Sequence, residues 1–152
     1  MQDENKYMIR AIALAQQAAA AGEIPVGAVL VDAATGEIIA EAGNLTERDH
    51  DPTAHAEVLI LRAGGAKLGT PRLAGCDLYV TLEPCAMCAA AISFARIRRL
   101  YFGAYDPKSG GVENAQPFYA QTTCHHRPDI YGGLHEQTCA QLMKDFFKDK
   151  RG

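Results

Sequence analysis

The sequence predicts an α/β domain in which helices pack against a sheet. Segments with strand and helix periodicity alternate along the chain, and residues 26–31 form an almost wholly apolar, β-branched run. Such a run is typical of a strand that is buried on both faces. The chain has 152 residues and contains neither an internal repeat nor a low-complexity linker. We therefore expect one domain over residues 1–152.

The amino-terminal segment predicts a helix followed by a hairpin. Apolar residues recur at helical spacing over residues 7–21, and Gly22 is expected to end that helix. After the strand at 26–31, residues 33–36 provide a turn and residues 37–42 provide a return strand.

A polar loop over residues 44–53 is expected next, with Pro52 and Thr53 suited to the start of a helix. That helix is expected over residues 54–63 and is closed by two glycines, Gly64 and Gly65. The remaining expected elements are a strand at 77–82, a helix at 86–95, a strand at 99–102, a turn-rich loop at 103–111, an irregular segment at 112–134 with a short strand near Ile130, and a helix at 134–148.

The composition is that of an ordinary globular protein. Hydrophobic residues make up 48% of the chain and charged residues 22%, which excludes disordered, collagen-like and coiled-coil classes. The longest apolar run, residues 24–31, is interrupted by Pro25 and Gly27 and is far shorter than the ~18 residues of a membrane span. The amino terminus carries Asp3 and Glu4 and lacks the pattern of a secretory signal. We expect a cytoplasmic protein without a membrane segment.

The charge is distributed unevenly along the chain. The net charge of −3 argues against a nucleic-acid binder, but residues 1–60 carry 10 acidic and 3 basic side chains, a net charge of −7. Residues 61–152 carry 8 acidic and 12 basic side chains, a net charge of +4, which hints at a polyanionic partner. Candidates for phosphate contacts, or equally for a solvated face, are Arg96, Arg98, Arg99, Lys144, Lys148, Lys150 and Arg151.

The five cysteines are an odd number, which argues against a disulfide framework. Two of them belong to the motif Pro84-Cys85-Ala86-Met87-Cys88, and a second motif is His55-Ala56-Glu57; both fall at expected helix starts. About 30 residues apart, they form the H-x-E…P-C-x-x-C pattern of zinc nucleoside and nucleobase deaminases.

Zinc chemistry explains why these residue types occur together. A catalytic zinc takes three protein ligands and a water, so we expect one zinc bound by His55, Cys85 and Cys88. Glu57 is then free to carry protons beside the activated water. Because residues two apart do not share a face of a regular helix, the convergence of His55 and Glu57 requires a special geometry at the helix start.

Other interpretations of the cysteines stay open at this point. Cys85 and Cys88 also suit a redox dithiol, or a structural zinc site completed from the segment Cys124-His125-His126, although Glu57 would then have no role. We expect that segment to serve loop packing or substrate-side contacts instead of a second metal site. Cys76 and Cys139 are expected to be small core or surface residues.

The chain resembles the bacterial tRNA-specific adenosine deaminases of the cytidine-deaminase-like superfamily. The zinc motif indicates the superfamily, and three further features narrow the resemblance to the tRNA-editing branch: Asp51-Pro52-Thr53, Asp106-Pro107-Lys108 and the terminal pair Phe146-Phe147. The resemblance covers residues 22–29, 44, 51–57, 78–88, 95–97, 102–108 and 146–147.

The resemblance implies a three-layer α/β/α fold around a five-stranded mixed sheet, a homodimer and tRNA as the partner. It matches His55, Cys85 and Cys88 to the zinc ligands and Glu57 to the proton shuttle. It also matches Asn44 to a residue that hydrogen-bonds the target nucleoside, and Asp106 to a position near the neighbouring nucleotides. From the sequence alone, Asn44 and Asp106 suit turn positions as well. The chain departs from the family pattern at residues 110–114 and 124–126, which shape the substrate-side loops.

The resemblance therefore implies hydrolytic deamination of an adenosine in a tRNA anticodon loop, at the wobble position, giving inosine and ammonia. Water activated by zinc would attack C6 of adenine while Glu57 moves the protons. The alternative is a deaminase of a free base or nucleoside such as guanine, cytosine or cytidine, with the same zinc chemistry. A third interpretation is a zinc-stabilised RNA-binding module without catalysis. Glu57 argues against it, because a proton carrier would have no role in such a module.

Overall fold

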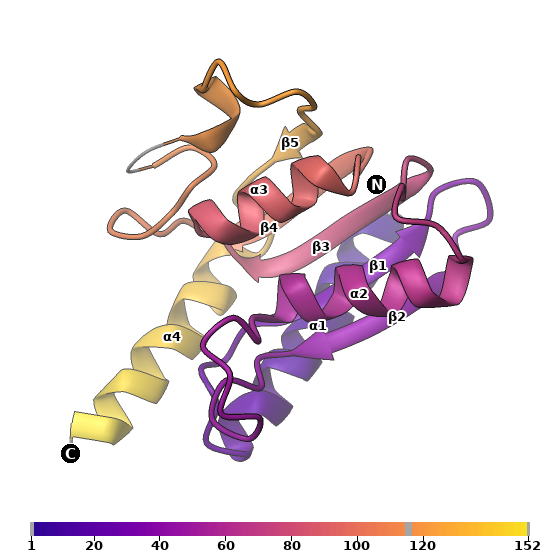
Figure 1. Ribbon diagram of the computed structural model, residues 1–152. Coiled ribbons are helices and arrows are strands. Elements are labelled where there is room, and N and C mark those ends of the chain that lie inside the picture. The colour runs from indigo at the N-terminus through magenta and orange to yellow at the C-terminus, as the bar shows by residue number, and fades with distance from the viewer. Residues whose placement is uncertain (1, 115–116, 152) are drawn as a thin grey trace.

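The computed structural model describes residues 2–114 and 117–151, and Figure 1 shows a sheet with helices on both sides. The strands are β1 (Gly27–Asp32), β2 (Ile38–Gly43), β3 (Cys76–Leu82), β4 (Arg99–Ala104) and β5 (Asp129–Tyr131). The helices are α1 (Gln2–Ala20), α2 (Ala56–Leu68), α3 (Ala86–Phe94) and α4 (Glu136–Arg151), with a short 3-10 helix, η1, at Phe118–Ala120.

The five strands form one mixed sheet in the order β2-β1-β3-β4-β5. Strand β1 pairs antiparallel with β2 and with β3, whereas β3, β4 and β5 run parallel. Helices α2 and α3 cover one face of the sheet, and α1 and α4 cover the other (Figure 1). This arrangement confirms the expected three-layer fold with a five-stranded mixed sheet.

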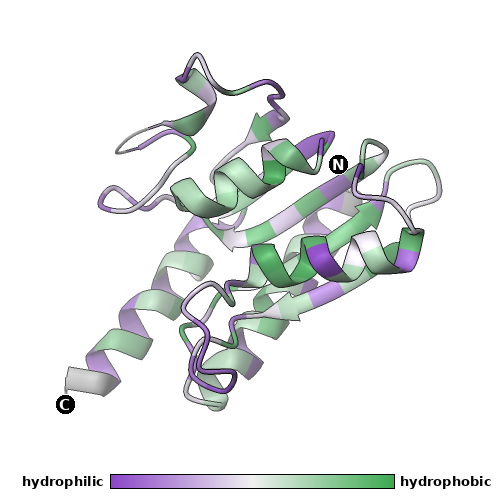
Figure 2. Cartoon of the chain, viewed as in Figure 1, coloured by the Kyte–Doolittle hydropathy of each residue, from purple (hydrophilic) through white to green (hydrophobic). Residues whose placement is uncertain are grey.

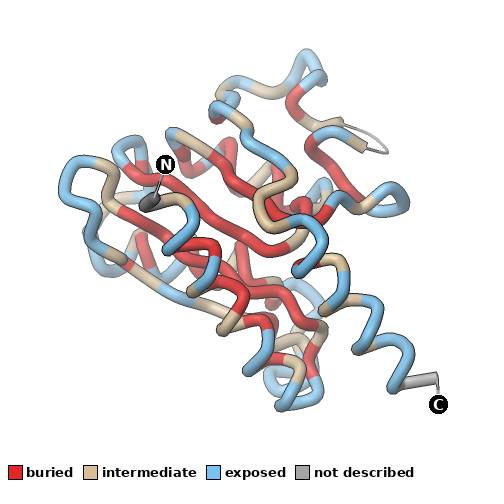
Figure 3. The backbone as a smooth tube through the Cα atoms, turned by 180° about the vertical axis from the view of Figure 1, so that it is seen from behind, coloured by how far each residue is buried: buried red, intermediate tan, exposed pale blue. Residues whose placement is uncertain are grey.

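The alternation of side chains along the strands creates two hydrophobic cores. In β1, Leu30 faces α2 and α3, and its neighbours Val29 and Val31 face α1 and α4. Because both faces are covered, β1 is apolar and buried from Gly27 to Val31, as the run at 26–31 predicted. Figure 3 shows the sheet as the buried centre of the molecule, and Figure 2 shows that α4 alternates hydrophobic and hydrophilic residues along its length.

The helix expected at 54–63 is present, but both of its predicted ends were wrong. Helix α2 begins at Ala56, because residues 51–53 form a turn in which the carboxylate of Asp51 accepts the backbone N–H of Thr53 at 2.8 Å. It continues past Gly64 because that glycine allows close contact with the sheet: a Cβ atom there would lie 2.4 Å from Cδ2 of Leu30. The helix ends at Gly69, which has a left-handed backbone conformation.

The other expected elements are present with shifted ends. Helix α1 begins at Gln2 instead of residue 7, β4 extends to Ala104, and α4 begins at Glu136 instead of residue 134. The short strand near Ile130 is confirmed as β5. Within the described ranges, no helix combines the length and apolar character that crossing a bilayer requires.

Candidate active site

A cavity of about 570 Å³ opens where β3 and β4 end and α2 and α3 begin. Five of the six residues singled out from the sequence line this one cavity: Asn44, His55, Glu57, Cys85 and Asp106. The sixth residue, Cys88, is fully buried beside it. The tertiary structure therefore brings together residues that are up to 62 positions apart in the chain.

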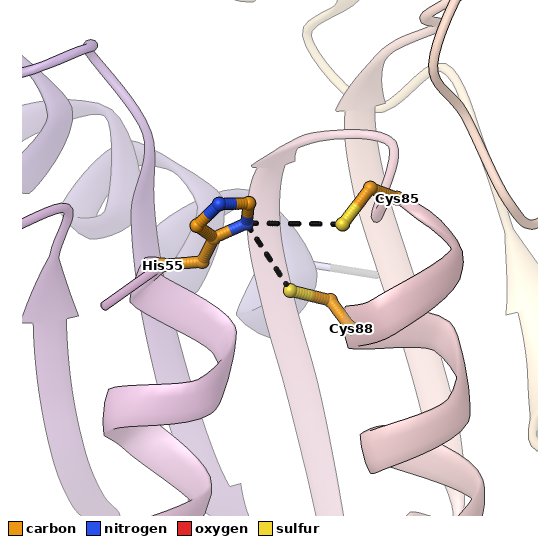
Figure 4. Close-up of side chains that lie close together, drawn as sticks. All are labelled: His55, Cys85 and Cys88. Carbon is orange, nitrogen blue, oxygen red and sulfur yellow. Dashed lines mark hydrogen bonds between the residues drawn. The ribbon is translucent and has the colours of Figure 1, made fainter. Parts of the chain in front are cut away.

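His55, Cys85 and Cys88 lie close enough to share one metal ion. Nδ1 of His55 is 3.7 Å from Sγ of Cys85 and 3.5 Å from Sγ of Cys88 (Figure 4). All three ligand atoms lie within 4.8 Å of one another, and no other group of this kind occurs among the described residues. One imidazole nitrogen and two sulfurs suit a tetrahedral zinc ion whose fourth position stays open to water.

The local backbone explains how His55 and Glu57 reach the same cavity. His55 is the N-cap of α2 and has an extended backbone (φ −72°, ψ 148°), so it does not follow helical spacing relative to Glu57. Cys85 is likewise the extended N-cap of α3 (φ −71°, ψ 175°), and Cys88 lies in the first turn. Both helices thus begin at the cluster, and the positive dipole end of each favours thiolates there.

The two thiols titrate very differently. A hydrogen bond from the Cys88 thiol, aided by His55, lowers the pKa of Cys85 to about 4, although burial opposes this shift. The same hydrogen bond and burial raise the pKa of Cys88 far above its usual range. Because zinc is bound by thiolates, metal binding must displace the proton that this pair retains.

Glu57 is a buried carboxyl group on the wall of the cavity. Its side chain is 4% exposed, and burial raises its pKa to about 7. A carboxyl group with a pKa near neutrality can both accept and donate a proton at physiological pH. Glu57 therefore has the position and the acidity that a proton carrier needs.

Asn44 combines a structural contact with a place in the cavity. It follows β2 directly, is 5% exposed, and its Oδ1 accepts the backbone N–H of Ala56 at 2.8 Å. This bond satisfies an N–H group at the start of α2 that lacks a partner within the helix. The two N–H donors of the same side-chain amide are chemically suited to a substrate in the cavity.

Asp106 begins a turn, as its sequence context also suggested. Its Oδ1 accepts the backbone N–H groups of Lys108 and Ser109 at 3.2 and 3.1 Å. The turn places Asp106, Lys108 and Ser109 together on one wall of the cavity, beyond the end of β4.

Sequence reasoning missed several features of the site. Lys144 and Phe147 of α4 line the cavity together with Met143, although α4 lies on the opposite side of the sheet from α2 and α3. Glu83 was also missed: it is 2% exposed, and its carboxylate binds the loop that follows β4. The only sequence signal for Glu83 was its place directly before the motif at 84–88.

The segment Cys124-His125-His126 packs against the end of α3. Ser93 donates a hydrogen bond to the backbone oxygen of His126 at 2.7 Å and lies 3.7 Å from Sγ of Cys124. The ring of His126 contacts the backbone oxygen of Ile97 at 2.8 Å. These contacts favour the loop-packing interpretation over a second metal site. Cys76 and Cys139 are buried in the two cores, as expected.

The fold separates the basic residues that were candidates either for phosphate contacts or for a solvated face. Arg98 forms a paired contact with Asp77, and Arg99 lies over the ring of Tyr131. Both arginines lie at the start of β4, roughly 17 Å from the cavity at its other end. The cations that line the cavity are Lys108 and Lys144. The side chains of Lys150 and Arg151 lie outside the described residues.

The fold and the site together define a zinc-dependent hydrolytic deaminase. Residues 1–104 match the cytidine and deoxycytidylate deaminase zinc-binding region. The tRNA-specific adenosine deaminase of Agrobacterium fabrum (strain C58 / ATCC 33970) is 52% identical over 151 residues, which cover 99% of this chain and 98% of that protein. The chain therefore belongs to the zinc-binding cytidine and deoxycytidylate deaminase family, in the group of tRNA-specific adenosine deaminases.

Solved structures agree with this assignment. A structure from studies of A-to-I editing by tRNA:A34 deaminases at the wobble position of transfer RNA matches with a TM-score of 0.87 and 54% identity. That match covers 90% of this chain and 98% of the other. A guanine deaminase from Nitrosomonas europaea, at 22% identity and a TM-score of 0.81, shares the fold over 93% of this chain and 83% of its own.

Proposed function

We propose that this protein converts adenosine to inosine at the wobble position of a tRNA anticodon loop and releases ammonia. The observation that carries the proposal is that Glu57, His55, Cys85 and two lysines line one cavity, with Cys88 buried beside it in the same His/Cys/Cys group. The resemblance to proteins named tRNA-specific adenosine deaminase, at 52% identity in one case, supports the choice of substrate. Residues 1–152 then form one deaminase domain.

Each candidate residue takes a role that its position supports. We assign the zinc ligands to His55, Cys85 and Cys88, and proton transfer to Glu57. The zinc ion, when bound, supplies the Lewis acidity that makes water a nucleophile at neutral pH. Glu57 takes up one proton of the attacking water and delivers it to the purine ring. It then moves the second proton, from the new hydroxyl group on C6, to the departing amine, which leaves as ammonia.

The other cavity residues are assigned to the RNA. The side-chain amide of Asn44 donates a hydrogen bond to the target nucleoside, and the wall that contains Asp106 contacts the nucleotides beside it. Lys108 and Lys144 lie where neighbouring phosphates would pass. A base in an anticodon loop is unpaired and can turn out of the stack, which allows a buried site to reach C6 of adenine.

We also propose that two copies associate through the outer surface of α2 and α3. Phe94 is 74% exposed there and lines a groove between the two helices. An exposed aromatic ring beside an apolar groove is typical of an association surface. The substitution Phe94→Asp should convert a dimer into monomers in sedimentation equilibrium, whereas Phe147→Asp, on α4, should leave the mass unchanged. A wild-type monomer at micromolar concentration would contradict the dimer.

The cytoplasm is the proposed location. All five cysteines are free thiols, which suits a reducing compartment, and a tRNA substrate is found there.

A panel of substrates tests the proposed activity. Zinc-loaded protein is incubated with whole tRNA, an anticodon stem-loop, adenosine, guanine, cytosine and cytidine, and ammonia and inosine are measured. We expect inosine at the wobble position of the tRNA and of the stem-loop, in amounts equal to the ammonia. Ammonia from guanine, cytosine or cytidine without inosine in RNA would instead identify a deaminase of free bases or nucleosides.

A further inference from the structure

A buried carboxylate beside the zinc-ligand motif binds an entire loop. Oε2 of Glu83 accepts the backbone N–H groups of Val112, Glu113 and Asn114 at 3.2, 2.7 and 3.0 Å. Oε1 accepts the backbone N–H of Asp106 at 3.0 Å and Nδ2 of Asn114 at 2.7 Å. Five donors from residues 106–114 thus converge on one side chain that is 2% exposed.

A negatively charged carboxylate at Glu83 suits these five N–H donors, because both of its oxygens accept hydrogen bonds. Among the described residues, every group that hydrogen-bonds the two oxygens is a donor, and a carboxylate is the side chain that accepts at both. A glutamine of the same shape would direct its own N–H₂ group at one set of donors.

The same loop is joined to the segment that carries Cys85. Gly110 forms a β-bridge with Cys85, and the backbone N–H of Gly111 donates to the oxygen of Pro84 at 2.7 Å. The fit around the carboxylate is close, because a Cβ atom on Gly110 would lie 2.5 Å from Cδ of Glu83. The loop and the metal-ligand segment therefore form one packed unit, with the Glu83 carboxylate at its centre.

This unit includes part of the wall of the cavity. Asp106, Lys108 and Ser109 line the cavity, and the backbone of Asp106 is held directly by Glu83. Displacement of this loop would change the shape of the cavity beside Cys85.

We propose that Glu83 is a positioning residue, which fixes the substrate-side wall at residues 106–114 relative to the metal ligand Cys85. The role in catalysis rests on the proposed function, whereas the role in loop placement does not. Glu83 itself borders the cavity, but both of its carboxylate oxygens are engaged by the loop, so we assign it no part in proton transfer. Its removal should therefore weaken RNA binding more than it slows the chemical step.

Amide hydrogen exchange tests the loop placement without any substrate. In zinc-loaded Glu83→Gln, the amides of Asp106, Val112, Glu113 and Asn114 should exchange at least 10-fold faster than in the wild type, with no change in the amides of β1 and β3. Asn114→Ala removes one of the five donors and should give a smaller change in the same amides, even if Glu83→Gln folds poorly.

Glu23→Gln provides a matched control. Glu23 is also 2% exposed, and its carboxylate accepts the backbone N–H groups of Glu47 and Arg48 at 3.0 and 2.8 Å on a different loop. This substitution should accelerate exchange at Glu47 and Arg48 and leave residues 106–114 unaffected.

Single-turnover kinetics on the anticodon stem-loop test the consequence for the substrate. We expect Glu83→Gln to retain one zinc per chain and to raise the RNA concentration for half-maximal rate about 10-fold, with a change of less than 3-fold in the rate at saturation.

Unchanged exchange in residues 106–114 would overturn the proposal. Faster exchange with an unaltered dependence on RNA would overturn its catalytic part. A wild-type protein that does not deaminate RNA would refute the proposed function and leave the exchange result intact.

Discussion

Two side chains from the start of α2, His55 and Glu57, enter the cavity in different chemical roles. His55 lies before the first helical residue, so its imidazole faces the sulfurs of Cys85 and Cys88. Glu57 lies inside the first turn and is buried, which raises its pKa to about 7. A shift of one residue in the start of α2 would separate the two groups.

The substitution Glu57→Gln should remove turnover and keep the metal. Glutamine retains the shape of glutamate but cannot carry protons, and a general acid–base group typically contributes ~10²–10⁴-fold to a rate. We expect at least a 100-fold loss in single-turnover rate on the stem-loop, with one zinc per chain by elemental analysis. A rate within 3-fold of the wild type would refute the role of Glu57.

The substitution Asn44→Asp should separate the two functions of that side chain. Aspartate still accepts the N–H of Ala56, and a negative charge at the start of α2 is favourable to the helix dipole. It has lost the N–H₂ donors that are assigned to the nucleoside. We expect an unchanged midpoint of urea unfolding and a loss of deamination of about 10-fold or more. Asn44→Ala, which also removes the helix contact, should in addition unfold at lower urea.

At the scale of elements, glycines set the distance between the helices and the sheet. A Cβ atom on Gly27 of β1 would lie 2.1 Å from the backbone oxygen of Ala11 in α1. A Cβ atom on Gly103 of β4 would lie 2.4 Å from Sγ of Cys139 in α4. These contacts keep α1 and α4 close to the sheet, and α4 in turn carries Lys144 and Phe147 to the cavity.

The substitution Gly27→Ala should destabilise the fold. The added methyl group meets backbone atoms that cannot move aside, and overpacking of this kind typically costs ~1–3 kcal/mol. Urea unfolding of the zinc-loaded protein measures the free energy of unfolding. Gly75→Ala is the matched control, because nothing lies within 4 Å of its added Cβ atom, and it should be at least as stable as the wild type.

At the scale of the whole molecule, the surplus of basic residues after residue 60 is not one surface. Arg98 and Arg99 lie at the end of β4 that is remote from the cavity, and Arg98 is engaged by Asp77. Lys108 and Lys144 reach the cavity from two different elements, a loop after β4 and helix α4. RNA binding by this protein should therefore depend on a small number of cations near the cavity.

Deamination of the stem-loop at sub-saturating RNA should fall as salt concentration rises, because phosphate contacts release counterions. The double substitution Lys108→Gln/Lys144→Gln should weaken the binding and reduce the slope of log affinity against log salt by about 1 for each lost phosphate contact. Lys67→Gln is the control: Lys67 lies in the last turn of α2, is 52% exposed and is 4.0 Å from Glu37. A salt response that is identical in all three proteins would contradict the assignment of the two lysines.

The sequence by itself determined the α/β class, the alternation of the elements and the candidate zinc ligands, because each leaves a local pattern. The strand at 26–31 is apolar on both faces, and the motifs at 55–57 and 84–88 each lie within a few consecutive residues, so they can be recognised without the fold. Local patterns also misled: Gly64 and Gly65 resembled a helix end, but Gly64 allows the close contact between α2 and Leu30.

Only the tertiary structure decided that His55 and Glu57 share a cavity and that Arg98 and Arg99 lie far from it. It also decided that α4 contributes Lys144 and that Glu83 holds the loop at 106–114. These features depend on contacts between residues distant in the chain, and no periodicity or spacing encodes which distant partner a buried carboxylate or a glycine will meet.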